Sequence, residues 1–481
     1  MSLSSAMSNA LSGLTATARM VDVISSNIAN VQTPGYGPRQ LDLGANATGG
    51  GVSALGVSRA SDLALLNDQR AATAETAGTT LVSDFYSQLE TTIGLPGDTG
   101  SLGDAVSGFD SALIQAAAAP DQSAGLSAVL DAAKSLAGQI NTISGQIATA
   151  RTGVDAAIAT GVDRVNTALV QTADLNARIR AQTVAGQDAS ALIDQRQAVL
   201  DQVADVLPLT QVARADGTIA VFTTGGAALL DGGAPATLGF TRARQITADM
   251  TVASGALSSL TLNGLAVPTN GAMLGNGALA ANFQIRDSLA PAAQSQIDAL
   301  ARDLADRFAS TSVDPTLGAT AAGLFTDAGA PVTAANETGL ATRLAVNSGV
   351  DPSQGGALWH LRDGLGATTA GEVGNGTILT AMQDALNALQ SPASGAVATG
   401  SVDTAGLGSQ VLSMVSTARL SAQNAASYAA ARSSALTTQA LQGGVDTDQQ
   451  LQQLLVVEKA YAANAKVIQT ADTMLQSLLE V

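Results

Sequence analysis

The sequence predicts a mainly α-helical protein with a β-rich insertion. Apolar residues recur every seven positions at both ends of the chain, which is typical of helices with one apolar face. Most of the remainder is Ala- and Gln-rich with helical periodicity, but one central stretch alternates apolar and polar residues between Gly turns. We therefore expect paired terminal helices, a long helical bundle built from both halves of the chain and a small outer β domain. The expected regions are 1–60 with 440–481 (terminal coiled coil), 61–207 with 286–439 (helical bundle, with an irregular segment at 311–376) and 208–285 (β-rich outer domain).

The N-terminal helix is indicated by two adjoining lines of side chains. These lines are Met7, Leu14, Val21 and Ile28, and Ala10, Thr17, Ile24 and Val31. One helix of roughly seven turns, on the order of 40 Å long, contains them both. We expect it to end at Thr33-Pro34-Gly35, because the residue before a proline is pushed out of the helical region and glycine permits a left-handed turn.

The C-terminal helix repeats this design, and its expected start is Asp446-Thr447-Asp448. Its two lines are Leu454, Tyr461, Ile468 and Leu475, and Val457, Asn464, Ala471 and Leu478. One pair of such helices cannot hide both apolar faces completely, so we expect the two helices to pack on each other and on neighbouring copies. The alternative is that the two terminal helices complete the helical bundle of a monomeric protein, without neighbouring copies.

The helical bundle is predicted from periodicity between the terminal helices. Its outgoing half comprises 63–94 and 101–207, with interruptions expected at Pro96-Gly97, Ala119-Pro120 and Gly153. The longest expected helix is therefore 154–206. Helices are expected to resume, after the β insertion, at 290–310, 378–389 and 406–442.

The β insertion is predicted to begin after Pro208. Apolar residues alternate around Asp216-Gly217, and Gly225-Gly226 marks a second turn, which together indicate hairpins. Shorter strand-like pieces continue through 257–267.

Charge and composition exclude several classes of function. The formal net charge is −17 and only Lys134, Lys459 and Lys466 are lysines, so we expect no nucleic-acid partner. The chain has no cysteine and therefore no disulfide or thiolate metal site. The longest uncharged run, 250–285, is interrupted by Gly, Asn, Pro, Ser and Thr, which argues against membrane insertion. No cleavable signal peptide is recognisable, so we expect a cytosolic protein or export without a cleaved signal.

No residue pattern supports an enzyme. The single histidine, His360, follows the single tryptophan, Trp359, and one histidine cannot form a two-histidine metal site. The dipeptide Gly-Lys of the phosphate-binding loop does not occur. Asp446 and Asp448 are expected to cap the last helix, because the twelve-residue calcium loop is missing. We predict no catalytic, cofactor-binding or metal-binding residue.

The segment SSNIANVQTPGYGPRQ, residues 25–40, resembles the N-terminal motif of bacterial flagellar axial proteins. That motif runs Asn-Ile-Ala-Asn, two residues, then Thr-Pro-Gly-Tyr. Its positions here are Asn27, Ile28, Ala29, Asn30, Thr33, Pro34, Gly35 and Tyr36. Residues 445–479 resemble the C-terminal partner helix of the same family, including Tyr461, Asn464 and Thr470-Ala471-Asp472.

Within this family, Arg39-Gln40 and the segments 85–113 and 192–212 are most similar to the hook–filament junction proteins. One departure is Gly37-Pro38, where the family usually has a single small residue, so we expect a longer turn after Tyr36. Hook and distal-rod members remain an alternative, although the long bundle argues against them. A secreted enzyme centred on His360 is the alternative from another class.

The resemblance implies a structural adaptor that joins hook to filament. Terminal helices of this family lie coaxially in an inner tube, where they self-assemble, and gain order on assembly. Implied partners are other copies of the chain, the hook protein, the second junction protein and an export chaperone at the C-terminal helix. The implied location is extracellular, in the flagellum. An intersubunit role is implied for Asn30, Tyr36 and Arg39. The expected assembly residues are Leu14, Val21, Asn27, Ile28, Asn30, Thr33, Pro34, Gly35, Tyr36, Arg39, Leu454, Tyr461, Asn464, Ile468 and Leu475.

Overall fold

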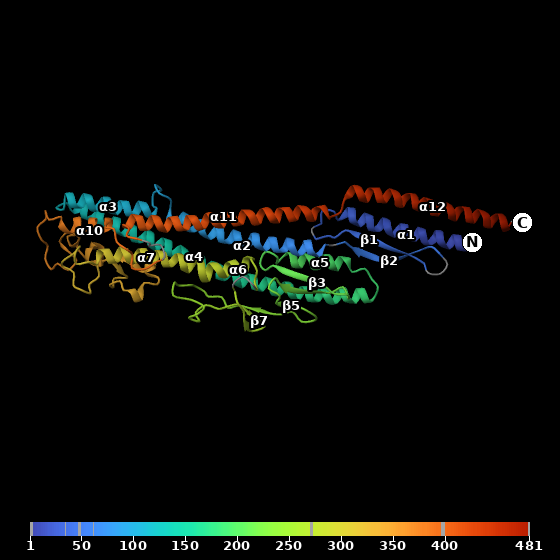
Figure 1. Ribbon diagram of the computed structural model, residues 1–481, viewed down its shortest axis with the longest axis horizontal. Coiled ribbons are helices and arrows are strands. Elements are labelled where there is room, and N and C mark those ends of the chain that lie inside the picture. The colour runs from blue at the N-terminus through green and yellow to red at the C-terminus, as the bar shows by residue number, and fades with distance from the viewer. Residues whose placement is uncertain are drawn as a thin grey trace.

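The protein is an elongated rod with both termini at the same end (Figure 1). The computed structural model describes residues 3–33, 35–46, 50–60, 62–269, 273–395 and 400–479. Helices run along almost the whole rod, and the small β elements lie along one flank of it (Figure 1). The predicted fold class, mainly α with terminal helices, a helical bundle and a β-rich part, is confirmed.

The end that holds the termini consists of two helices and a hairpin. Helix α1 (Leu3–Ala29) packs against α12 (Thr447–Leu479), and β1 (Arg39–Ala45) pairs antiparallel with β2 (Val52–Arg59). The sequence analysis did not predict this hairpin. The start of β2 is tied to α1, because the backbone N–H of Val52 donates to Ser12 Oγ at 3.2 Å. Helix α1 also ends four residues before Thr33, since Asn30 and Thr33 already lie in turns.

Eight helices of the described residues form the bundle: α2 (Leu63–Ile93), α3 (Leu102–Ala118), α4 (Ser123–Val184), α5 (Ser190–Asp201), α6 (Ala278–Gln284), α7 (Ala290–Phe308), α10 (Thr377–Asn387) and α11 (Thr404–Gln442). The predicted interruption at Gly153 was wrong. Helix α4 continues through it because Ile147 and Ile158 keep one buried face on either side, and a single glycine costs a helix only about 1 kcal/mol. The longest helix is therefore 123–184, and not 154–206.

The β elements form two small sheets between α5 and α6. Strands β3 (Leu209–Ala213), β4 (Ile219–Thr223) and β5 (Ala228–Leu230) make one antiparallel sheet, with Gly217 at φ 80° in the first turn. The second sheet contains β6 (Leu238–Gly239), β7 (Thr261–Leu262) and β8 (Leu265–Ala266). These positions agree with the predicted hairpins.

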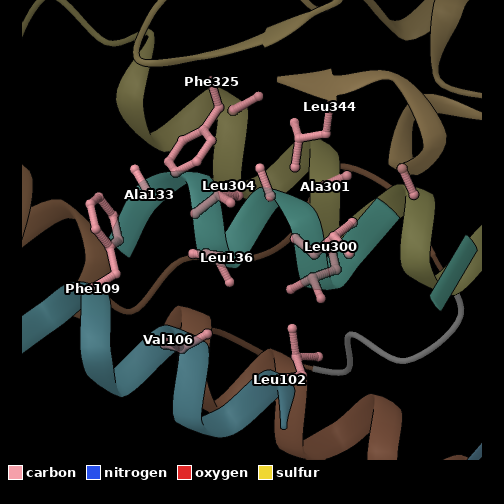
Figure 2. Close-up of a cluster of buried hydrophobic side chains, with 14 of the residues drawn as sticks. Leu102, Val106, Phe109, Ala133, Leu136, Leu300, Ala301, Leu304, Phe325 and Leu344 are labelled. Atoms are coloured by element: carbon pink, nitrogen blue, oxygen red, sulfur yellow. The ribbon is translucent and has the colours of Figure 1, made fainter. Parts of the chain in front are cut away.

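Two buried apolar clusters stabilise the rod. The first joins α3, the first half of α4, α7 and the irregular segment, and its centre contains Phe109, Phe308 and Phe325 with ring centroids 5.4–5.8 Å apart. Figure 2 shows Leu102, Leu136 and Leu300 among the buried side chains of the same cluster. The second cluster joins α4 beyond Ile158, α5, β3–β5 and Phe283. The sheet β3–β5 thus shares its core with α4, while the three-region division of the chain stays a prediction.

A fully buried arginine fixes the second sheet to the bundle. Arg286 is 0% exposed and lies in a π-helical turn, Ile285–Leu289, between α6 and α7. Its Nη1 is 2.7 Å from Asp155 Oδ1 on α4, and its Nη2 donates to the Ser258 carbonyl at 3.0 Å. The guanidinium also stacks on Phe240 and Phe283, at 5.4 and 4.9 Å from the ring centroids. One side chain therefore connects α4, the π turn and the loop before β7.

The irregular segment contains β9 (Phe325–Asp327), α8 (Leu340–Arg343), β10 (Leu344–Val346), α9 (His360–Asp363) and 3₁₀ turns at 334–336, 348–350 and 352–354. An ion pair ties it to α4. Lys134 Nζ is 2.8 Å from Asp351 Oδ2, and Ser353 Oγ donates to Asp351 Oδ1 at 2.8 Å. The hydrogen bond from Lys134 holds the pKa of the Asp351 carboxyl well below its usual value, and the bond from Ser353 adds to the effect.

The Asp351 carboxylate gives a pH-dependent contribution to stability. Because its pKa is lower in the folded chain, the contribution is present above the unfolded pKa of about 4 and is lost as pH falls through the folded pKa. We expect Asp351→Asn to lower the urea midpoint at pH 7, with the difference from wild type shrinking as the pH falls below about 4. Circular dichroism across pH 2–7 measures it, and Asp121→Asn, at an exposed carboxylate, is the control. An equal difference at every pH would contradict the assignment.

Candidate assembly site

Asn27 is the centre of a hydrogen-bonded junction at the end of α1. It is 1% exposed. Its Oδ1 accepts from the Tyr36 hydroxyl at 2.8 Å and from the Arg39 backbone N–H at 2.9 Å. Its Nδ2 donates to the Arg39 carbonyl at 2.8 Å and to Gln450 Oε1 at 3.0 Å. All four hydrogen-bonding positions of the amide are therefore used, and they join α1, the hairpin and α12.

The neighbouring motif residues shape the turn that follows α1. Asn30 Nδ2 donates to the Ser26 carbonyl at 2.9 Å, and Thr33 Oγ1 donates to Asn30 Oδ1 at 3.2 Å. Gly35 has φ 79°, the left-handed region that the sequence predicted for it. The predicted Pro34 lies outside the described residues. These contacts direct the chain out of the helix and into β1.

Tyr36 and Arg39 pack on each other within the chain. The Arg39 guanidinium lies 4.9 Å from the centroid of the Tyr36 ring. Between them, Gly37 is buried, and a Cβ at this position would overlap the side chain of Arg59. Asn30, Tyr36 and Arg39 each make side-chain hydrogen bonds within their own chain, although the buried Arg39 Nε has no partner there. The intersubunit role implied for them stays a prediction.

Asp194 connects this terminal unit to the bundle. Its Oδ2 is 3.1 Å from Arg39 Nη2, and its Oδ1 is 2.6 Å from Arg59 Nε. The backbone N–H of Gly37 donates to Oδ1 at 3.2 Å. Arg59 Nη2 also donates to the Gly35 carbonyl at 3.2 Å. We call this group, Asp194 with Arg39, Arg59 and Gly37, the carboxylate clasp. It joins both strands of the hairpin to α5 through charge-assisted hydrogen bonds.

The clasp was missed by sequence reasoning. The segment 192–212 resembles hook–filament junction proteins, but it does not indicate a partner for Asp194. The two arginines that bind Asp194, Arg39 and Arg59, lie 155 and 135 residues away along the chain. An acidic residue directly after Leu192 and Ile193 was the available signal, since a carboxylate on the apolar side of a helix needs a buried partner.

Two further polar side chains of α5, Arg196 and Gln197, are buried near the clasp. Arg196 Nη1 donates to Asn176 Oδ1 on α4 at 2.8 Å and to the Gly217 carbonyl in the β3–β4 turn at 3.0 Å. Burial lowers the pKa of Arg196 to about 10, so the side chain stays cationic at neutral pH. Gln197 Oε1 accepts from Arg70 Nη2 on α2 at 2.7 Å. Helix α5 therefore links the hairpin to α2, α4 and the first sheet.

The two predicted lines of the terminal helices differ in burial. In α1, Ala10, Thr17 and Ile24 of one line are buried, whereas Leu14, Val21 and Ile28 of the other are half-buried. In α12, Val457 and Ala471 are buried, Leu454, Asn464 and Ile468 are half-buried, and Tyr461 and Leu475 are exposed. One helix partner and a hairpin cover only one side of each helix, so the line with Leu14 in α1 and the line with Leu454 in α12 stay partly accessible.

Helices α1 and α12 approach each other closely at Gly13. A Cβ at this position would be 2.7 Å from Asn464 Nδ2, so glycine allows the two helices to meet. Elsewhere, a groove of about 630 Å³ runs between α1, the hairpin and α12, with Val23, Leu41 and Val456 among its walls. Further apolar side chains of α12 are exposed: Leu451, Leu455, Val467, Met474 and Leu478.

The residues considered for catalysis or metal binding have ordinary structural contacts. His360 Nδ1 is 2.9 Å from the Gly364 carbonyl, and its ring stacks on Trp359 with centroids 3.7 Å apart. Asp446 caps α12 by accepting from the Asp448 and Gln449 N–H groups, as predicted. Within the described residues, no group of three or more His, Cys, Asp or Glu could hold a metal ion. No described helix is both long and apolar enough to cross a bilayer.

Three protein-family models match parts of the chain. A family model described as the flagellar hook-associated protein FlgK helical domain matches residues 86–314. Models of the flagella basal body rod protein and of the flagellar basal body rod FlgEFG protein C-terminal segment match 7–36 and 442–481. The chain is thus similar to flagellar hook-associated proteins over 86–314 and to flagellar rod proteins at both ends. The resemblance predicted from residues 25–40, 85–113 and 445–479 is thereby confirmed.

Relatives within the hook-associated family are distant in sequence. Flagellar hook-associated protein 1 of Escherichia coli is 27% identical over 241 residues, which are 48% of this chain and 44% of that protein. The Salmonella typhimurium protein of the same name is 27% identical over 240 residues, 48% of this chain and 43% of its own. The chain spans less than half the length of these curated relatives. The flagellar hook junction protein FlgK of Burkholderia pseudomallei is similar in structure, with TM-score 0.45, 20% identity and coverage of 54% of this chain and 46% of that one.

Proposed function

We propose that this chain is a structural adaptor subunit of the bacterial flagellum that joins the hook to the filament. The observation that carries the proposal is the match of residues 86–314 to the hook-associated helical domain, flanked by matches of both ends to axial-protein segments. Its neighbours are other copies of the chain, the hook protein on one side and the second junction protein on the other. No observation favours a hook or rod subunit or an enzyme over this function.

The terminal helices support self-assembly for a physical reason. Their pairing leaves one apolar line accessible on each helix, including Tyr461 and Leu475. Apolar side chains of this kind gain free energy when neighbouring copies cover them, at about 25 cal/mol per Å². Coaxial packing of many copies into an inner tube covers both lines. Before assembly, an export chaperone covers α12, and the subunit leaves the cell without a cleaved signal.

Deletion of the gene tests this function. We expect the bacterium that encodes this chain to build complete hooks without attached filaments and to release filament subunits into the medium. Electron microscopy of the cell surface measures it, and re-expression of the chain from a plasmid is the control. Normal filaments in the deletion strain would overturn the junction assignment.

A further inference from the structure

The outward face of α11 carries no unpaired charge. Residues 404–442 contain only two charged side chains, Arg419 and Arg432. Arg419 is paired with Glu90 at 2.6 Å and Arg432 with Glu75 at 2.8 Å, both on α2. Most other outward residues are Ala, Ser, Thr, Asn and Gln. The exposed large side chains among them are Met414, Leu420, Tyr428 and Leu441, of which Leu420 and Tyr428 have 54% and 71% of their surface exposed.

This neutral face is unusual because the chain has a net charge of −17. Two copies of so acidic a protein repel each other, and they approach most easily where neither presents an unpaired carboxylate. Helix α11 also continues towards α12 along the same edge of the rod (Figure 1). A neighbouring copy that contacts the terminal helices is therefore positioned to contact α11 as well.

A cavity lies on another side of α11. It has a volume of about 510 Å³ and is bounded by α2, α11 and the segment from α6 to the π turn. Phe283 and Ala281 form an apolar floor, and Gln284 and Asp287 add polar groups. The Asp287 carboxylate is paired with Arg286 Nε at 2.8 Å. Ala422 and Ala425 belong to its wall. At 3.6 residues per turn, they lie between about 60° and 120° around α11 from Tyr428, so the side chain and the cavity face different directions.

We propose that Tyr428 of one copy inserts into this cavity of a second copy that stands beside it. The contact is heterologous, so it repeats from copy to copy and suits a ring or helical array. The cavity matches the side chain chemically, because the ring packs on Phe283 and Ala281 while the hydroxyl reaches the polar groups of Gln284 and Asp287. Tyrosines in apolar pockets commonly dominate binding energy at protein interfaces. The inference rests on the proposed function, which places several copies side by side.

Cross-linking tests the contact directly, because the chain has no cysteine of its own. We would express the full chain with Tyr428→Cys and Gln284→Cys together in the deletion strain, treat the intact flagella with a short bis-maleimide and separate the products on a denaturing gel. We expect a ladder of dimers, trimers and larger products from the double variant. Neither single variant should give a ladder, since each supplies only half of the contact.

The outcomes separate this contact from the proposed function. Filaments that remain attached in the double variant, without a ladder, would overturn the Tyr428 contact and leave the junction function standing. Dimers from Tyr428→Cys alone would indicate a symmetric contact, and a cross-link to another protein would indicate a different occupant; both overturn the proposal. If the wild-type chain is absent from isolated flagella, both the proposed junction function and the Tyr428 contact are wrong.

A matched pair of substitutions measures how much the contact contributes. We expect Tyr428→Ser to reduce several-fold the fraction of the chain that sediments with sheared hooks. Val170→Ser, at a position on α4 with 60% exposure, should leave that fraction unchanged. Equal fractions in the two variants would contradict the role of Tyr428.

Discussion

Replacing Asp194 with Asn is expected to release the terminal unit from the bundle. The substitution removes the charge that Arg39 and Arg59 share and leaves two largely buried guanidinium groups without a counter-ion. Hydrogen bonds to charged groups contribute about 1.5–3 kcal/mol each, so local opening of the terminal unit should become roughly 10- to 100-fold more frequent. Limited proteolysis of the isolated subunit should cut within α1 and α12 correspondingly faster.

The matched control is Asp174→Asn. Asp174 is an exposed acid on α4 whose partner, Arg178, is 3.8 Å away, and such surface pairs contribute about 0–1 kcal/mol. It should leave the cleavage rate unchanged. Equal rates for the two variants would show that the clasp does not fix the terminal unit. For the flagellum, we expect Asp194→Asn to assemble poorly because the inner helices no longer have a fixed direction relative to the outer bundle.

Replacing Arg286 with Ala is expected to have the largest effect on global stability. It leaves the buried Asp155 carboxyl on α4 without its Arg286 partner and removes the cation that stacks on Phe240 and Phe283. Breaking a buried pair by removing one partner costs about 3–5 kcal/mol. The urea unfolding free energy followed by circular dichroism measures this loss.

Two further variants separate the ion pair from simple packing. The double change Arg286→Met with Asp155→Leu should recover much of the loss, because neither buried charge remains. Arg178→Ala, which breaks an exposed pair, should cost less than about 1 kcal/mol. A single Arg286→Ala variant as stable as Arg178→Ala would refute the role of the buried pair.

Helices and hairpins could be predicted where residues close together in the sequence determine them. The heptad spacing at both ends indicated α1 and α12, and Asp216-Gly217 indicated the first hairpin of the β part. Gly153 was misleading, because a helix tolerates one glycine when tertiary packing holds both sides of it. The hairpin β1–β2 was missed because its stability depends on α1, through contacts such as that between Ser12 and Val52.

The sequence by itself determined the order of the elements, the acidic surface and the family motif around Asn27, since periodicity, composition and short motifs are properties of neighbouring residues. Only the tertiary structure decided what those residues contact. Asn27 meets Gln450 across a separation of 423 residues, and Asp194 meets Arg39 across 155. The sequence shows that a charged side chain needs a partner when it is buried, but which residue becomes that partner depends on how distant segments pack. For that reason the carboxylate clasp could be identified only from the folded chain.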